Sequence, residues 1–257
     1  MSTLLPQAEI NDLLDTLLSQ MQTVLGHKLV GVYLYGSLVW GDFDRESSDI
    51  DLVVATSSDI DAQEFSNLDT MQLGFVDTYT YWNGRIEIVY VSIATLQTFK
   101  SHPSKIAVIS PGEPFHFKET DPGWLMNWYI VQEQGRTLFG PAPTTLIDPI
   151  SQPEFIQTVK QHAAGWGEWI YDSRARPSQA YAILTMCRAL YTCKHGVQVS
   201  KRKAAEWAVQ ELPEWSAVIN NALLWRSMWR DDNVDATATF SETLRFVQFV
   251  IAQIKAT

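Results

Sequence analysis

Apolar residues form three short runs in the first part of the chain. The runs span residues 29–35, 50–55 and 85–92 and are rich in β-branched and aromatic side chains. Runs of this length and composition are typical of buried β-strands. Residues 7–25 have a different pattern, in which apolar side chains recur every three or four positions. This spacing predicts an amphipathic helix that leads into the first strand.

The remaining segments predict mostly helices. Residues 61–73 are weakly helical, 93–100 predict a short helix, 101–122 have few periodic cues, and 123–135 predict a longer helix. Three prolines between positions 141 and 149 indicate a domain boundary. Beyond it, short polar turns separate predicted helices at roughly 152–172, 177–195, 200–212, 214–229 and 239–255.

Together these elements predict an α+β fold in two domains. The N-terminal domain, residues 1–145, is expected to hold a small mixed sheet with helices, and the C-terminal domain, residues 146–257, an all-α bundle. A chain of 257 residues is long enough for each domain to bury its own core.

Composition narrows the classes of partner. With 46% hydrophobic and 19% charged residues, the chain has the make-up of a globular protein. Its net charge of −10 argues against nucleic acid as the main partner and suits a cationic substrate. No signal peptide or long apolar span is visible, so we expect a cytoplasmic monomer without a membrane partner. Cys187 and Cys193 face different directions on one predicted helix, so no disulfide is expected.

Candidate chemistry lies where the first two strands meet their connecting loop. The first strand ends at Gly36-Ser37, and the second begins within Ser48-Asp49-Ile50-Asp51. Because side chains alternate along a strand, Asp49 and Asp51 point the same way. Two carboxylates so placed repel each other unless a cation lies between them. Mg²⁺ suits this position because it prefers oxygen ligands and leaves room for substrate phosphates.

Two cationic positions in the C-terminal domain break local patterns. Arg188 shares a helical stripe with two tyrosines and a leucine, where it requires an anion, either an internal carboxylate or a phosphate. Ser200 is a predicted N-cap that puts Lys201 and two further cations into the first helical turn, where the helix dipole disfavours positive charge. This run is either a solvated surface or a site for a polyphosphate.

The spacing from Gly-Ser to Asp-x-Asp resembles the signature of the DNA-polymerase-β-like nucleotidyltransferase superfamily. Residues 178–212 and 135–141 are similar to motifs of the bacterial aminoglycoside O-adenylyltransferases that modify streptomycin and spectinomycin. This resemblance covers nearly the whole chain. It implies a resistance enzyme that transfers AMP from ATP to a hydroxyl of a cationic aminocyclitol or aminoglycoside, with two Mg²⁺ ions. The alternatives are a nucleotidyltransferase that adenylylates a protein or another small molecule, of regulatory or toxin–antitoxin type, and a nucleotide-binding module without activity.

The resemblance also assigns roles in the N-terminal domain. It puts Ser37 and Ser48 near the nucleotide phosphates and makes Asp49 and Asp51 the Mg²⁺ ligands. In the superfamily, a third carboxylate comes from a strand beside the Asp-x-Asp strand. Glu87 is the candidate for it and would be the base for the attacking hydroxyl, with Asp77 as the reserve candidate.

In the C-terminal domain, the resemblance makes Arg188 and Lys201 the ligands of the triphosphate. Trp225 or Arg226 would contact the adenine, and the alignment does not choose between them.

Two positions bear on the choice of drug. In dual-specificity relatives, streptomycin is held by a tryptophan after the third strand and by an aspartate before the arginine helix. The corresponding residues are Pro114 and Ser178, which offer neither a ring nor a charge. Trp124 is the nearby residue that would replace the missing ring. We therefore predict adenylylation of spectinomycin at its 9-hydroxyl, and of streptomycin poorly or not at all.

Overall fold

The chain folds as two compact units. The computed structural model describes residues 7–171, 174–227 and 236–257. Unit 1 ends at Ile150 and unit 2 begins at Ser151, a few residues beyond the predicted boundary. Sheet and helices in unit 1 and helices in unit 2 confirm the predicted α+β class. None of the helices in the described ranges has the length and apolar character needed to cross a membrane.

Unit 1 is built on one mixed, six-stranded sheet with the order β5-β4-β3-β2-β1-β6. Strands β2 and β3 run parallel, and every other neighbouring pair is antiparallel. The strands are β1 (Leu29–Tyr35), β2 (Ile50–Thr56), β3 (Ile86–Ser92), β4 (Lys105–Ile109), β5 (His116–Glu119) and β6 (Arg136–Phe139). The first three match the apolar runs of the sequence within one residue at each end.

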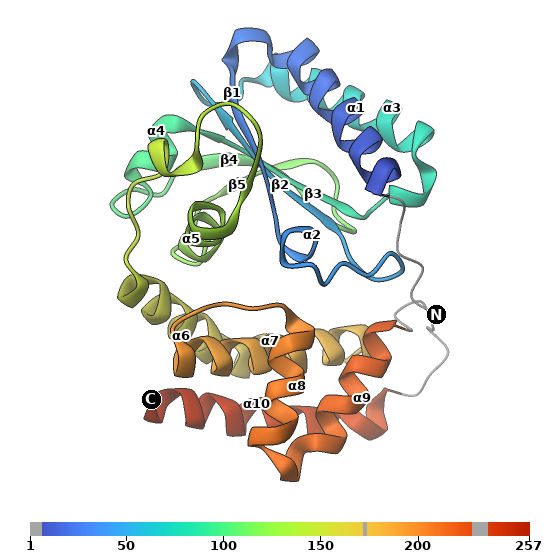
Figure 1. Ribbon diagram of the computed structural model, residues 1–257, viewed down its shortest axis with the longest axis vertical. Coiled ribbons are helices and arrows are strands. Elements are labelled where there is room, and N and C mark those ends of the chain that lie inside the picture. The colour runs from blue at the N-terminus through green and yellow to red at the C-terminus, as the bar shows by residue number, and fades with distance from the viewer. Residues whose placement is uncertain (1–6, 172–173, 228–235) are drawn as a thin grey trace. The chain divides into compact units, whose positions relative to one another are not determined.

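Helices cover both faces of this sheet (Figure 1). On one face α1 (Gln7–Leu25) and α3 (Ala62–Thr78) pack side by side, and their apolar residues share a core with alternate residues of the central strands. Helix α5 (Trp124–Gln134) lies on the other face, and α2 (Ser37–Trp40) and α4 (Ile93–Thr98) are short connections.

Three segments differ from the sequence-based expectation. Helix α3 extends past the predicted residues 61–73 to Thr78, because the buried Phe75 anchors its last turns. The segments 101–122 and 135–141 were assigned no helix or strand from the sequence; the first contains β4 and β5, and the second contains β6. Strand β5 is a four-residue edge strand whose side chains all remain at least partly exposed. An edge strand of this kind needs no alternation of apolar and polar residues, so its sequence does not indicate a strand.

Unit 2 is helical throughout its described residues. Helix α7 packs against each of the other four helices, and eleven of its residues are buried. The helices are α6 (Gln152–Trp169), α7 (Arg176–His195), α8 (Lys201–Glu211), α9 (Ser216–Ser227) and α10 (Thr237–Ala256). The predicted ends at residues 172 and 228–229 lie outside the described residues. Both cysteines are free, as expected, and burial raises the pKa of the Cys187 thiol.

Candidate active site

A row of three polar side chains crosses the centre of the sheet in unit 1. In the strand register Tyr35 pairs with Asp51 and Asp51 pairs with Glu87, so the three lie side by side on β1, β2 and β3. The Tyr35 hydroxyl donates a hydrogen bond to Glu87 Oε1 over 3.3 Å. Tyr35 is buried, whereas Asp51 and Glu87 remain partly exposed. The row therefore presents two carboxylates to solvent from adjacent parallel strands.

Gly36 forms a close-fitting wall for the Asp51 carboxylate. A Cβ atom at position 36 would lie 2.0 Å from Asp51 Oδ2, well inside van der Waals contact. The backbone at Gly36 has φ 75° and ψ −148°, a region that only glycine adopts readily. Glycine is therefore required here both for the turn from β1 into α2 and for the space that the carboxylate occupies.

The loop before β2 brings Asp49 to the start of that strand. Asp49 is partly exposed and lies two residues before Asp51. Ser48 is 3% exposed, and its hydroxyl accepts a hydrogen bond from the Asp44 backbone N–H over 3.0 Å. Ser37, the first residue of α2, is partly exposed. The contact of either serine with phosphate stays a prediction, and the bond to Asp44 gives Ser48 a structural role within the loop.

These carboxylates fit a magnesium ion that shares its ligands with a substrate. Mg²⁺ prefers oxygen donors and is commonly held by one or two carboxylates, water and nucleotide phosphates. In the described ranges, no three or more His, Cys, Asp or Glu side chains form a complete metal-ligand group. The donor set of Asp49 and Asp51, with the Gly36 wall beside it, suits an open site rather than a closed structural one.

The other acidic and aromatic candidates of unit 1 lie elsewhere. Asp77 is exposed near the end of α3 and belongs to no strand, so the structure does not bring it to the carboxylate row. Trp124 is 9% exposed and stacks on Trp128 at a centroid distance of 5.4 Å, so its faces serve the packing of α5. Pro114 is exposed in the turn between β4 and β5.

The cationic candidates of unit 2 lie on α7 and α8. Arg188 is partly exposed in the second half of α7. Lys201 is the first residue of α8, and its Nζ lies 3.8 Å from the ring centroid of Tyr181, which is 46% exposed. The predicted N-cap at Ser200 is confirmed, because its Oγ accepts a hydrogen bond from the Lys203 backbone N–H.

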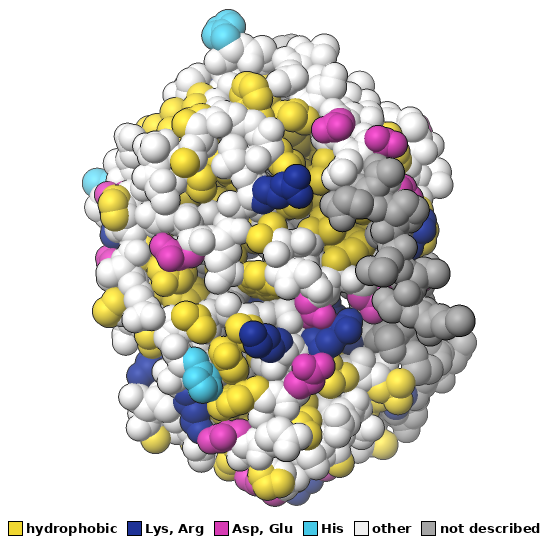
Figure 2. Space-filling model, viewed as in Figure 1, with side chains coloured by type: hydrophobic (Ala, Val, Ile, Leu, Met, Phe, Trp, Pro, Cys, Tyr) yellow, Lys and Arg dark blue, Asp and Glu magenta, His cyan; other side chains and the backbone are white. Residues whose placement is uncertain are grey.

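The remaining candidates of unit 2 differ in exposure. Ser178 is partly exposed in the first turn of α7. Trp225 is 9% exposed, and the Arg176 guanidinium lies over its ring at 5.0 Å from the centroid. Arg226, the next residue, is partly exposed. On the face drawn in Figure 2, cationic side chains are scattered singly or in small groups among uncharged and acidic ones.

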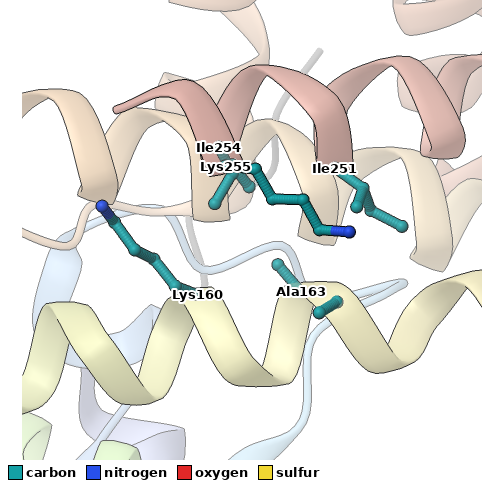
Figure 3. A pocket seen from close by; sticks show the side chains of 6 residues that line it. Lys160, Ala163, Ile251, Ile254 and Lys255 are labelled. Atoms are coloured by element: carbon teal, nitrogen blue, oxygen red, sulfur yellow. The ribbon is translucent and has the colours of Figure 1, made fainter.

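A small pocket lies between α6 and α10 of unit 2 (Figure 3). Four apolar side chains line it together with two lysines: Ala163, Ala164, Ile251, Ile254, Lys160 and Lys255. None of the candidate site residues lines it. It is therefore not part of the predicted site.

Two residues of the site received no role from the sequence pattern alone. Tyr35 was a strand residue and Gly36 a strand end, and their contacts with Glu87 and Asp51 depend on strand register. A glycine directly after an apolar run is a signal for a special backbone conformation. It does not reveal which side chain the glycine makes room for.

Comparisons with known proteins agree with this arrangement. A nucleotidyltransferase domain model matches residues 14–110, and a model of the aminoglycoside adenylyltransferase C-terminal domain matches residues 145–253. An aminoglycoside (3'') (9) adenylyltransferase from Escherichia coli is 24% identical over 96% of this chain and 95% of its own length. A spectinomycin 9-adenylyltransferase from Staphylococcus aureus is 24% identical over 76% of each chain.

One solved structure shares the fold over almost its full length. It is the spectinomycin adenyltransferase AAD(9) from Enterococcus faecialis, crystallised with ATP and spectinomycin. Its TM-score is 0.74 at 15% identity, over 95% of this chain and 99% of that one. The two family models together span most of the chain, and the chain belongs to the aminoglycoside adenylyltransferases, enzymes of the nucleotidyltransferase class.

Proposed function

We propose that the protein catalyses Mg²⁺-dependent transfer of AMP from ATP to the 9-hydroxyl of spectinomycin, and so confers resistance to that drug. The observation that carries the proposal is the pairing of Asp51 with Glu87 on adjacent parallel strands, with Asp49 directly before the first residue of the strand that carries Asp51. The names of the relatives and the ligands of the neighbouring structure support the choice of ATP and of an aminocyclitol.

In the proposed reaction the drug hydroxyl oxygen bonds to the α-phosphorus of ATP, and the bond from that phosphorus to pyrophosphate breaks. Glu87 accepts the hydroxyl proton, a role worth about 10² to 10⁴ in rate. The Tyr35 hydroxyl, bonded to Glu87 Oε1, holds the carboxylate in place. A buried donor is suited to this because its own position is fixed by the core.

Asp49 and Asp51 are the proposed ligands of two Mg²⁺ ions. When bound, the ions would offset the charge of the triphosphate and lower the pKa of the acceptor hydroxyl. The contribution of the protein is to carry Asp49 and Asp51 where the loop enters β2, with Gly36 closing one side of Asp51. Correct placement of reacting groups supplies much of the rate in nucleotidyl transfer.

Arg188 and Lys201 are the proposed ligands of the triphosphate from unit 2. The position of Lys201 at the N-terminus of α8 supports this, because the helix dipole there favours an anion. The aromatic face of Tyr181 stabilises the ammonium group before phosphate arrives. For the adenine contact we propose Arg226, because burial and the Arg176 guanidinium limit access to the Trp225 ring.

Pro114 and Ser178 underlie the proposed preference for spectinomycin. Compared with dual-specificity relatives, the chain lacks an aromatic contact and a charge-assisted contact with streptomycin at these positions. Together such contacts are worth about 3 kcal/mol, which is roughly a hundredfold in affinity. The burial of Trp124 supports the proposal, because the ring that would replace the missing one is already used in packing.

The test is a panel of aminocyclitols and aminoglycosides incubated with ATP and Mg²⁺, read by pyrophosphate release and by product mass. We expect an AMP adduct of spectinomycin. If none of the drugs in the panel causes pyrophosphate release, and AMP is instead found on a protein in a cell extract, the result would support the protein-modifying alternative.

A further inference from the structure

Arg85, a residue with no role in the proposed reaction, is buried beside the loop that carries Asp49. It directly precedes β3 and is 2% exposed, which is rare for an arginine. Its Nη2 donates to the backbone carbonyls of Arg45 and Ser48, each at 2.5 Å. Its Nε and Nη1 have no hydrogen-bond partner in the described part of the chain. Burying a guanidinium costs free energy, so packing alone does not account for an arginine at this position.

Arg85 forms hydrogen bonds with both sequence neighbours of Asp49. The side chain bonds the carbonyl of Ser48, and the Arg85 carbonyl accepts the backbone N–H of Ile50 over 3.0 Å. Both neighbours of Asp49 are therefore tied to one residue. That residue lies two positions before Glu87, so the same anchor connects the loop to the strand of the proposed base.

The guanidinium itself is held in one orientation. Its central carbon lies 4.9 Å from the ring centroid of Tyr81 and 5.0 Å from that of Trp82. The Tyr81 hydroxyl donates to the Arg45 carbonyl over 2.9 Å, so this hydroxyl and the Arg85 guanidinium donate to the same loop oxygen. A planar fork that stacks on rings and reaches two carbonyls is a geometry that lysine cannot reproduce.

Hydrogen bonds between Asp44 and Ser48 also hold the loop together, so a contact that fixes the Ser48 carbonyl restrains the whole loop. The Ser48 N–H donates to the Asp44 carbonyl over 2.7 Å, and the Asp44 N–H donates to Ser48 Oγ. A displacement of the Ser48 carbonyl therefore moves the loop as a unit, and Asp49 with it.

We propose that Arg85 is a positioning residue that sets the Mg²⁺ affinity of the site by fixing the backbone on both sides of Asp49. This inference rests on the proposed function, in which Asp49 is a metal ligand. Groups that orient metal ligands commonly change metal affinity by about 10- to 100-fold when they are removed.

Mn²⁺ titration of the full chain, read by electron paramagnetic resonance of the free ion, measures this affinity without turnover. We expect Arg85→Met to weaken Mn²⁺ binding by about tenfold or more, and Arg85→Lys by a smaller, several-fold factor. The matched control is Arg45→Met. The Arg45 guanidinium lies over the same Tyr81 ring at 4.8 Å, but only its backbone carbonyl, which the substitution keeps, bonds Arg85. We expect it to bind Mn²⁺ as the unmodified protein does.

Asp49→Asn separates failure of this inference from failure of the proposed function. If Asp49→Asn binds Mn²⁺ normally, the metal assignment of the proposed function is wrong. If Asp49→Asn weakens binding while a folded Arg85→Met keeps normal affinity, the positioning role is overturned alone. Should Arg85→Met fail to fold, Arg85→Lys decides, and a folded lysine variant with unchanged Mn²⁺ affinity overturns the inference.

Discussion

Substitution of Gly36 by alanine tests whether the wall beside Asp51 matters for catalysis. The backbone at Gly36 lies in a region where other residues are strained by about 1–3 kcal/mol. The added Cβ would also lie 2.0 Å from Asp51 Oδ2 and 2.9 Å from Asp51 Cγ. The carboxylate must then move by roughly 1 Å or more, a displacement that can lower a rate about 10²-fold.

Gly41→Ala is the matched control for this prediction. Gly41 also has a positive φ, of 70°, but a Cβ there meets nothing within 4 Å. Both variants should lose thermal stability, by about 2–4 °C for each kcal/mol of strain. Steady-state adenylylation kinetics and thermal unfolding of both proteins are the assays. We expect a 10²-fold or larger loss of kcat/KM in Gly36→Ala and a rate within a few-fold of normal in Gly41→Ala. A folded Gly36→Ala with normal kcat/KM would refute the reasoning, as would an equal loss in the control.

Four further substitutions test the proposed roles. Asp51→Asn should abolish transfer and leave the melting temperature of the metal-free protein unchanged or raised, because one like charge is removed; Mg²⁺-dependent turnover in this variant would contradict the metal assignment. Glu87→Gln should keep ATP binding by calorimetry and lower the single-turnover rate about 10² to 10⁴-fold, since glutamine cannot accept the proton; an equal loss of ATP affinity would make Glu87 a ligand instead. Lys201→Ala and Arg188→Ala should each weaken ATP binding by about 1.5–3 kcal/mol and leave drug binding without nucleotide unchanged; normal ATP affinity in both would exclude a phosphate contact.

Strong local periodicity explains which elements were predictable from the sequence. The helix over residues 7–25 and the strand over residues 29–35 have the predicted bounds, because each has a continuous apolar pattern that no tertiary contact overrides. The hairpin of β4 and β5 was not predicted. Its strands are short, one lies at the sheet edge, and the intervening prolines and glycine indicate only a turn.

The sequence predicted the acidic residues of the candidate site, but it did not predict how the site is arranged in space. The Asp-x-Asp spacing and the resemblance pointed to Asp49, Asp51 and Glu87, and strand register then brings Asp51 and Glu87 together. The anchoring of the loop by Arg85 depends on side chains far apart in the sequence. An arginine before a strand has no local pattern that reveals its burial, so only the folded chain shows this contact.

The most direct test of the proposed function is the comparison of kcat/KM for spectinomycin and streptomycin, with ATP and Mg²⁺ saturating and the product identified by mass and by the position of the new phosphate ester. We predict AMP on the 9-hydroxyl of spectinomycin and a kcat/KM for streptomycin lower by about a hundredfold or more. Comparable values for the two drugs would contradict the roles given to Pro114 and Ser178, and the absence of any AMP adduct of spectinomycin would contradict the proposed function itself.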